Sequence, residues 1–122
     1  MQTPTAAKRI KITLTNRAPV TIDPAQWGTI ANAGWYSGQY ECQANEIEFL
    51  RVRRHADGRV IVYGVRESGP GGMPMSYVGA RGGELVLAGR SIAAAIQRVG
   101  ESIDAQESTI SECIAAMPAE EL

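Results

Sequence analysis

The sequence predicts an α+β fold. An antiparallel sheet of about four strands is centred on a hairpin over residues 47–65, with one short N-terminal helix and a C-terminal helix pair packed on it. Two observations carry this prediction. Runs rich in Val, Ile, Phe and Tyr flank Asp57-Gly58, a dipeptide that tolerates the positive φ of a tight turn. Apolar residues then recur at helical spacing after Ser91 and again after Asp104.

The composition is that of a folded globular chain, and we expect a single domain over residues 1–122. The chain is 44% hydrophobic and 20% charged. No apolar run approaches the roughly 20 residues that cross a bilayer, and the first residues have no apolar signal core. We therefore expect a cytoplasmic protein. Cys42 and Cys113 do not make a disulfide framework, so we expect two free thiols.

The N-terminal third predicts two strands and a short helix. Ile10, Ile12 and Leu14 alternate with polar residues, which indicates a strand with one buried face. Residues 20–22 form a second short strand, which Pro19 places at a sheet edge or a strand start. Asp23-Pro24 has the pattern of an N-cap followed by the first helical position. The sequence thus predicts a helix that contains Trp27 and ends near Gly34.

The central hairpin predicts which side chains share a face. With a two-residue turn at Asp57-Gly58, Val52 faces Tyr63 and Leu50 faces Val65, and these pairs form one apolar face. The opposite face then carries Arg51, Arg53 and His55.

The C-terminal half predicts two further strand segments and two helices. Residues 66–74 form a Gly/Pro-rich loop without the Gly-Lys-Ser/Thr ending of a phosphate-binding loop. Residues 75–81 and 84–87 are expected as strands separated by a turn at Gly82-Gly83. Ser91 caps a helix that ends at Gly100 or continues to Ile103; its apolar face is Ile92, Ala95, Ile96, Val99 and Ile103. Asp104 starts the last helix, whose apolar face is Ile110, Cys113, Ile114 and Met117.

Charge and chemistry disfavour several function classes. The net charge of −1 argues against bulk nucleic-acid binding, which needs a basic excess. The charges are unevenly placed, because residues 101–122 carry six acidic residues and no basic one; this asymmetry is either functional or a solvated helix face. His55 lies beside Asp57, but the chain places no nucleophile near them. One histidine and two distant cysteines have no metal-ligand spacing, so no metal or other cofactor is expected.

Two groups of residues are candidates for partner binding. The first is the basic set, because a guanidinium binds carboxylates and phosphates through two parallel hydrogen bonds; its members are Arg51, Arg53, Arg54 and Arg59. Alternatively, Glu46, Glu48 or the acidic C-terminal helix neutralises these arginines within the chain. The second group is aromatic: Trp35, Tyr36 and Tyr40 either form a binding rim or cover the end of the sheet.

Four segments carry a resemblance to known proteins: residues 14–20, 53–64, 81–85 and 110–122. They resemble a group of small uncharacterised proteins carried by conjugative elements and prophage-like islands of proteobacteria. The resemblance runs over most of the chain and brings no catalytic motif with it. Cargo of this kind often includes inhibitors of host defence, among them anti-CRISPR proteins. The resemblance therefore implies an inhibitor of a host nucleic-acid-targeting complex of the CRISPR type.

We expect a non-enzymatic, protein-binding module of a bacterial mobile element. The alternative is a nucleic-acid-binding accessory protein that uses the Arg-rich face of the hairpin. A small enzyme is the third hypothesis, which the absence of a nucleophile–base pair and of a metal-ligand set disfavours. The oligomeric state and the identity of the partner stay open.

Overall fold

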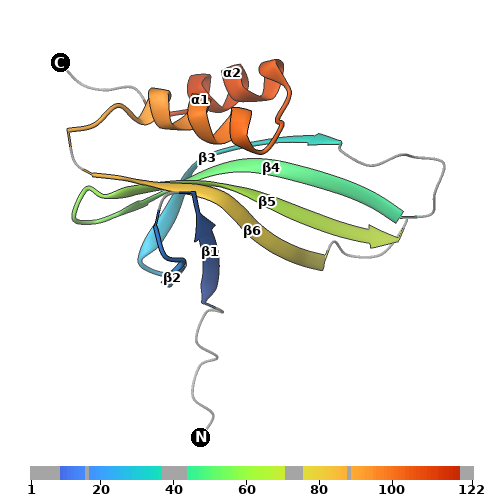
Figure 1. Ribbon diagram of the computed structural model, residues 1–122, viewed down its shortest axis with the longest axis horizontal. Helices are drawn as coiled ribbons and strands as arrows, with labels where there is room; N and C mark the ends of the chain where they lie inside the picture. Colours follow the sequence, from blue (N-terminus) through green and yellow to red (C-terminus); the bar gives the residue numbers. More distant parts are fainter. Residues whose placement is uncertain (1–8, 16, 37–43, 71–75, 88, 119–122) are drawn as a thin grey trace, which may run out of the picture.

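Six strands and two helices make up the described part of the chain, and both helices lie on one face of a single sheet (Figure 1). The computed structural model describes residues 9–15, 17–36, 44–70, 76–87 and 89–118. The strands are β1 (Ile10–Leu14), β2 (Val20–Ile22), β3 (Trp27–Tyr36), β4 (Ala44–His55), β5 (Val60–Pro70) and β6 (Ser76–Val86). The helices are α1 (Ile92–Ser102) and α2 (Glu107–Ala115).

The sheet is mixed, with the strand order β2-β1-β6-β5-β4-β3. β1 pairs with β6 in parallel, and all other neighbours pair antiparallel. The prediction of an antiparallel sheet of about four strands is therefore wrong, although the α+β class is correct.

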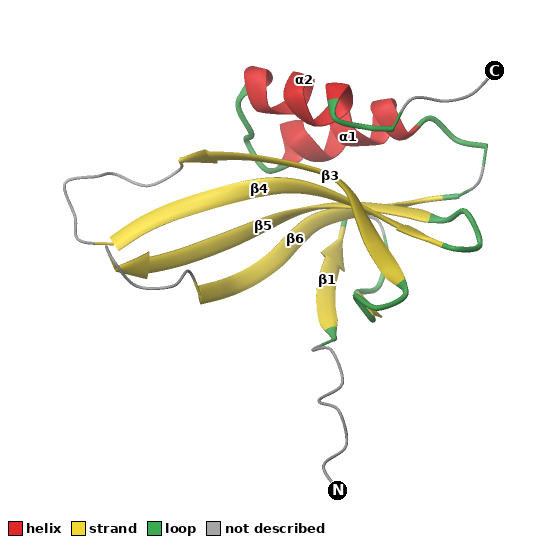
Figure 2. Cartoon of the chain, turned by 180° about the vertical axis from the view of Figure 1, so that it is seen from behind, coloured by secondary structure: helices red, strands yellow, loops and turns green. Residues whose placement is uncertain are grey.

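The two edges of the sheet, β2 and β3, follow each other in the chain. Only residues 23–26 join them, and so short a connection between opposite edges requires the sheet to curl. Ile22 and Trp27 accordingly belong to one apolar cluster. Figure 2 shows the result: β1 turns away from the long strands, on the side opposite the helices. Beyond this curl, β4, β5 and β6 continue together as a long arm.

The predicted helix after Asp23 is wrong, because the chain makes a single turn there and then enters β3. The Asp23 carboxylate accepts a hydrogen bond from the backbone N–H of Ala25 (2.9 Å). The backbone carbonyl of Asp23 accepts hydrogen bonds from the backbone N–H groups of Gln26 (2.9 Å) and Trp27 (3.1 Å). An aspartate that bonds the backbone two residues on stabilises turns and helix starts alike. The Asp23 side chain therefore does bond the backbone as an N-cap would, but in a turn and not at the start of a helix.

The central hairpin is confirmed, but its connection is one residue longer than predicted. The backbone N–H of His55 donates to the carbonyl of Arg59 (2.9 Å), so three residues form the loop. Gly58 takes the positive φ of 96°. Val52 consequently faces Val62, and Leu50 faces Gly64. This slip by one residue turns Tyr63 and Val65 to the face that carries Arg51 and Arg53.

Both faces of the sheet are buried, which explains why β5 begins with an unbroken apolar run. Val60, Ile61, Val62, Tyr63 and Val65 are each at most 2% exposed. The helix face packs against α1 and α2 through Leu50, Val52, Val60, Val62, Ala95, Ile96, Val99, Ile110 and Cys113. The opposite face packs inside the curl through Ile12, Leu14, Ile22, Trp27, Ile61, Tyr63, Val65 and Ala80.

β6 is one continuous strand, so the predicted turn at Gly82-Gly83 is wrong. Gly82 takes φ 64° and accompanies a register shift against β5, as expected of a bulge rather than a turn. The predicted loop at residues 66–74 is also partly strand, because β5 extends to Pro70. Residues 71–74 of that loop lie outside the described part.

The helix predictions are largely confirmed. The Ser91 hydroxyl accepts a hydrogen bond from the backbone N–H of Ala94 (3.1 Å), as an N-cap should. α1 continues past Gly100 to a C-cap at Ile103. α2 begins at Glu107 with Gln106 as its N-cap, whereas Asp104 lies in the connection with φ 59°. Neither described helix is long and apolar enough to cross a bilayer.

Candidate functional site

Arg53 ties three strands together on the face opposite the helices. Its Nε donates to the hydroxyl of Tyr63 (2.8 Å), and its Nη1 donates to the backbone carbonyl of Trp27 (2.9 Å). Tyr63 is fully buried, so its hydroxyl needs such a partner. These contacts explain Arg53 as a structural residue that links β3, β4 and β5.

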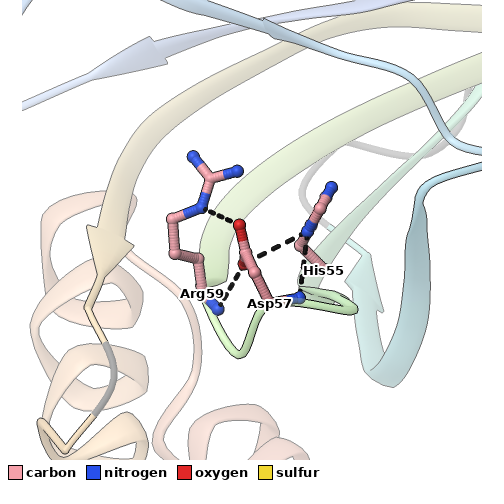
Figure 3. A network of polar contacts seen from close by, with 3 residues as sticks. All are labelled: His55, Asp57 and Arg59. Carbon is pink, nitrogen blue, oxygen red and sulfur yellow. Dashed lines mark hydrogen bonds and ion pairs between the residues drawn. The ribbon is translucent and has the colours of Figure 1, made fainter.

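The hairpin tip forms a second polar network, which Figure 3 shows around Asp57. The Asp57 carboxylate accepts from the backbone N–H of Arg59 (3.0 Å) and from its Nε (2.8 Å). The Arg59 guanidinium lies 5.1 Å from the ring centroid of Trp27, and the ring of His55 lies at the same distance from that indole. Through these two contacts with Trp27, the tip of the hairpin packs against the start of β3.

The Arg59 contacts lower the pKa of Asp57. Its pKa is lowered, first by the hydrogen bond from the backbone N–H of Arg59 and then by the guanidinium of the same residue. His55 Nδ1 lies 3.1 Å from both the Asp57 backbone N–H and the Asp57 carboxylate. Nδ1 accepts the amide proton only when it is unprotonated, and it donates to the carboxylate only when protonated.

Arg51 and Arg54 differ in their surroundings. Arg51 shares the strand face of Arg53, as predicted; its Nε donates to the side-chain carbonyl of Asn32 (2.9 Å), and its guanidinium lies 5.5 Å from the ring centroid of Phe49. Arg54 is exposed near the hairpin tip. The groups that accept these hydrogen bonds from Arg51 and Arg53 are neutral, whereas the predicted neutraliser Glu48 lies on the other face of the sheet.

The predicted aromatic group is only partly described. Trp35 is 7% exposed and belongs to the core beneath the helices, which is the arrangement expected if these residues cover the sheet. The backbone of Tyr36 ends β3, but its side chain lies outside the described part, as does all of Tyr40.

Sequence reasoning missed a charged cleft on the helix face. A cleft of about 490 Å³ opens where the α1–α2 connection overhangs the sheet. Its polar lining includes Glu48, Arg66 and Arg81 from three neighbouring strands. The sequence did contain a signal for this site: Glu48 lies on the same strand face as Leu50 and Val52, whose side chains form the core. The correct register of β5 and β6 was needed to bring the two arginines to it.

β3 is an unusual edge strand. It is ten residues long, and from Trp27 to Tyr36 it contains no charged residue and no proline. Its inner side pairs with β4, and no described strand lies along its outer side. The other edge, β2, has only three residues and lies between Pro19 and Pro24. Proteins normally protect edges with charges, prolines or short strands, and β2 is protected while β3 carries only a bulge.

Features of enzyme chemistry are weak among the described residues. No three His, Cys, Asp or Glu side chains there are grouped to hold a metal ion. Burial raises the pKa of the Cys113 thiol to about 11, and the charge of Glu112 adds to this. A thiol with so high a pKa is a poor nucleophile at neutral pH.

Comparison with known proteins adds no assignment: no protein family, no curated protein and no solved structure matches the chain.

Proposed function

We propose that the protein is a non-enzymatic binding module that adds an extended segment of a partner protein to the outer side of β3. The single observation that carries this proposal is the ten-residue edge strand without charge or proline. Such an edge presents a row of backbone N–H and C=O groups that a second strand can pair with. Strand addition of this kind is a recurrent mode of peptide recognition.

The setting of β3 supports the proposal, because the strand is held rigidly. It pairs with β4 from Trp27↔His55 to Tyr36↔Ile47, and α2 packs over it. A template that is already ordered loses little conformational entropy when a partner binds. On the face away from the helices, β3 exposes the small side chains of Thr29 and Asn32 and the backbone of Gly34. These residues leave room for the side chains of an added strand.

The Arg-rich alternative has weaker support. Arg53 and Arg59 are engaged within the fold, and their removal would disturb the hairpin before it disturbed any partner. Binding to nucleic acid would therefore depend mainly on Arg54, which is exposed near the hairpin tip, because Arg51 also donates a hydrogen bond within the fold, to Asn32. Such binding would also fall steeply with salt, because phosphate contacts release counterions.

The biological role that we propose follows from the sequence resemblance. The module would act in the cytoplasm as cargo of a bacterial mobile element and would inhibit a host defence complex of the CRISPR type. Phage plaquing on a host with active CRISPR interference tests this role. Expression of the protein should raise the plaquing efficiency, and an unchanged efficiency across the CRISPR types tested would contradict it.

The binding site itself is tested with a matched pair of variants. Thr29→Glu places a charge on the exposed edge β3, and Thr21→Glu places the same charge on the exposed edge β2. Each tagged variant is incubated with host lysate, and recovered proteins are quantified by mass spectrometry. We expect Thr29→Glu to lose a partner that wild type and Thr21→Glu both recover, because a charge on an edge blocks strand pairing.

Three outcomes would contradict the proposal. The first is equal recovery of every partner by both variants. The second is loss of the partner in an Arg54→Ala variant but not in Thr29→Glu, together with salt-sensitive binding to DNA or RNA. The third is a wild-type dimer, detected by light scattering, that Thr29→Glu converts to a monomer, because the edge would then be occupied by a second copy of this chain.

A further inference from the structure

The cleft on the helix face brings together one buried carboxylate and two guanidinium groups. Glu48 on β4 lies directly opposite Trp35 on β3 and Arg66 on β5. Arg81 reaches the same carboxylate from β6. The connection between α1 and α2 contributes Ile103, Asp104 and Gln106 to the opposite wall. Four strands and a helix connection thus build one concave site.

Among the described side chains that contact one another at this site, the charges do not balance. The Glu48 side chain is 7% exposed, and its Oε1 lies 2.5 Å from Nη2 of Arg81 and 3.7 Å from Nη2 of Arg66. In these contacts one carboxylate faces two guanidinium cations. The side chains of Arg66 and Arg81 remain 40% and 46% exposed, so they can still reach a ligand in the cleft.

The hydrogen-bond donors also outnumber the acceptors. Each guanidinium has five N–H groups, whereas both ion pairs engage the same oxygen atom, Oε1 of Glu48. Among the described side chains, Nε of Arg66 is buried and has no hydrogen-bond partner. A buried donor without an acceptor costs free energy. A ligand with an additional acceptor atom can draw the Arg66 guanidinium toward it and so recover part of that cost.

We propose that this cleft binds a carboxylate group through Arg66 and Arg81. A planar carboxylate can accept two parallel hydrogen bonds from one guanidinium group. Its single negative charge equals the net positive charge of Glu48, Arg66 and Arg81 taken together. Asp104 on the rim adds a negative charge, which opposes a dianion more strongly than a singly charged carboxylate. The buried indole of Trp35 forms an apolar wall beside the site. Gln106, the N-cap of α2, places the positive end of that helix dipole at the rim.

The test is a titration of the folded protein with sodium acetate, monitored by NMR of the arginine Nε–H groups. Ionic strength is held constant with sodium chloride, and inorganic phosphate is titrated in parallel. We expect saturable shifts for Arg66 and Arg81 with acetate, and none for Arg53, which is held by Tyr63 and Trp27. Acetyl-alanine and its amide then distinguish a peptide carboxyl terminus from a free small carboxylate. If the natural ligand is a peptide carboxyl terminus, acetyl-alanine should bind more tightly than acetate, and its amide, which lacks the carboxylate, should not bind.

Variants make the proposal falsifiable. Arg66→Met should weaken acetate binding at least tenfold, and Arg54→Met, which removes the same charge from an exposed position elsewhere, should leave it unchanged. Glu48→Gln should tighten binding, because it removes the internal carboxylate that competes for both arginines. The proposal is overturned if acetate causes no saturable shift, if Arg54→Met weakens binding as much as Arg66→Met, or if phosphate binds more tightly than acetate.

Discussion

Gly58 is the residue on which the hairpin connection depends most directly. Its φ of 96° lies in the region that side chains with a Cβ rarely adopt. Gly58→Val should therefore lower the free energy of unfolding by about 1–3 kcal/mol. Gly28→Val is the matched control, since Gly28 has no neighbour within 4 Å of an added Cβ and lies in a strand. Urea denaturation that shows equal stability for the two variants would contradict the turn geometry.

Asp57 gives the hairpin tip a dependence on pH. Its pKa is lowered from 3.8, so the folded state binds its proton less readily than the unfolded state does. The resulting stabilisation is present above the unfolded pKa and is lost as the pH falls through the folded pKa. Asp57→Asn keeps an acceptor for the Arg59 backbone but loses the charge. The stability gap between wild type and this variant should thus narrow as the pH falls below 3.8. A gap that is constant with pH would show that the charge contributes nothing.

Cys113 should be chemically silent in the folded protein. Its thiol is free and fully buried, its pKa is about 11, and its Sγ lies 3.7 Å from the carbonyl oxygen of Leu50. We expect alkylation at about pH 8, below this thiol's raised pKa, to leave Cys113 unmodified in native protein and to modify it in urea, without any reductant. Peptide mass spectrometry checks both states. Rapid native modification would contradict the packing of α2. The predicted free thiol of Cys42 stays a prediction, because that residue lies outside the described part.

At the scale of elements, most of the signals that act within a few residues gave correct predictions, and Asp23 is an exception. The alternation in residues 10–14, the Asp57-Gly58 turn and the Ser91 cap all act within a few residues, and the structure has β1, the hairpin and α1 at those places. The Asp23 signal failed because a turn and a helix start share the same first hydrogen bond. The parallel pairing of β1 with β6 joins residues far apart in the chain, and no local pattern encodes it.

Gly100 tests how α1 meets α2. In an isolated helix, replacing glycine with alanine stabilises by roughly 1 kcal/mol. Here an added Cβ would lie 2.5 Å from Cγ1 of Ile110, so Gly100→Ala should instead destabilise by about 1–3 kcal/mol through overpacking. Pairing it with Ile110→Val, which removes one methyl group at the contact, should lessen the penalty in a double-mutant cycle by thermal denaturation. A stabilising Gly100→Ala would contradict the contact.

At the scale of the whole molecule, the candidate sites depended on the fold more than on any motif. The shared face of Arg51 and Arg53 was predictable from strand alternation alone. The contact of Arg53 with Tyr63 was not, because it required the one-residue slip of the hairpin. The buried state of Trp35 was one of two alternatives that the sequence left open, and the open edge of β3 followed only once β3 replaced the predicted helix that ended near Gly34. The Glu48 cleft could not be predicted without the register of the four strands that line it.

Hydrogen–deuterium exchange on the free protein and on its complex with the recovered partner tests the central claim most directly. Amides on the outer side of an edge strand exchange readily unless another strand pairs with them. Strand addition predicts that the partner adds protection at residues 29–34 of β3 and leaves the hairpin tip at residues 54–59 unchanged. Protection at the hairpin tip with none on β3 would contradict strand addition and would assign binding to the Arg-rich hairpin instead.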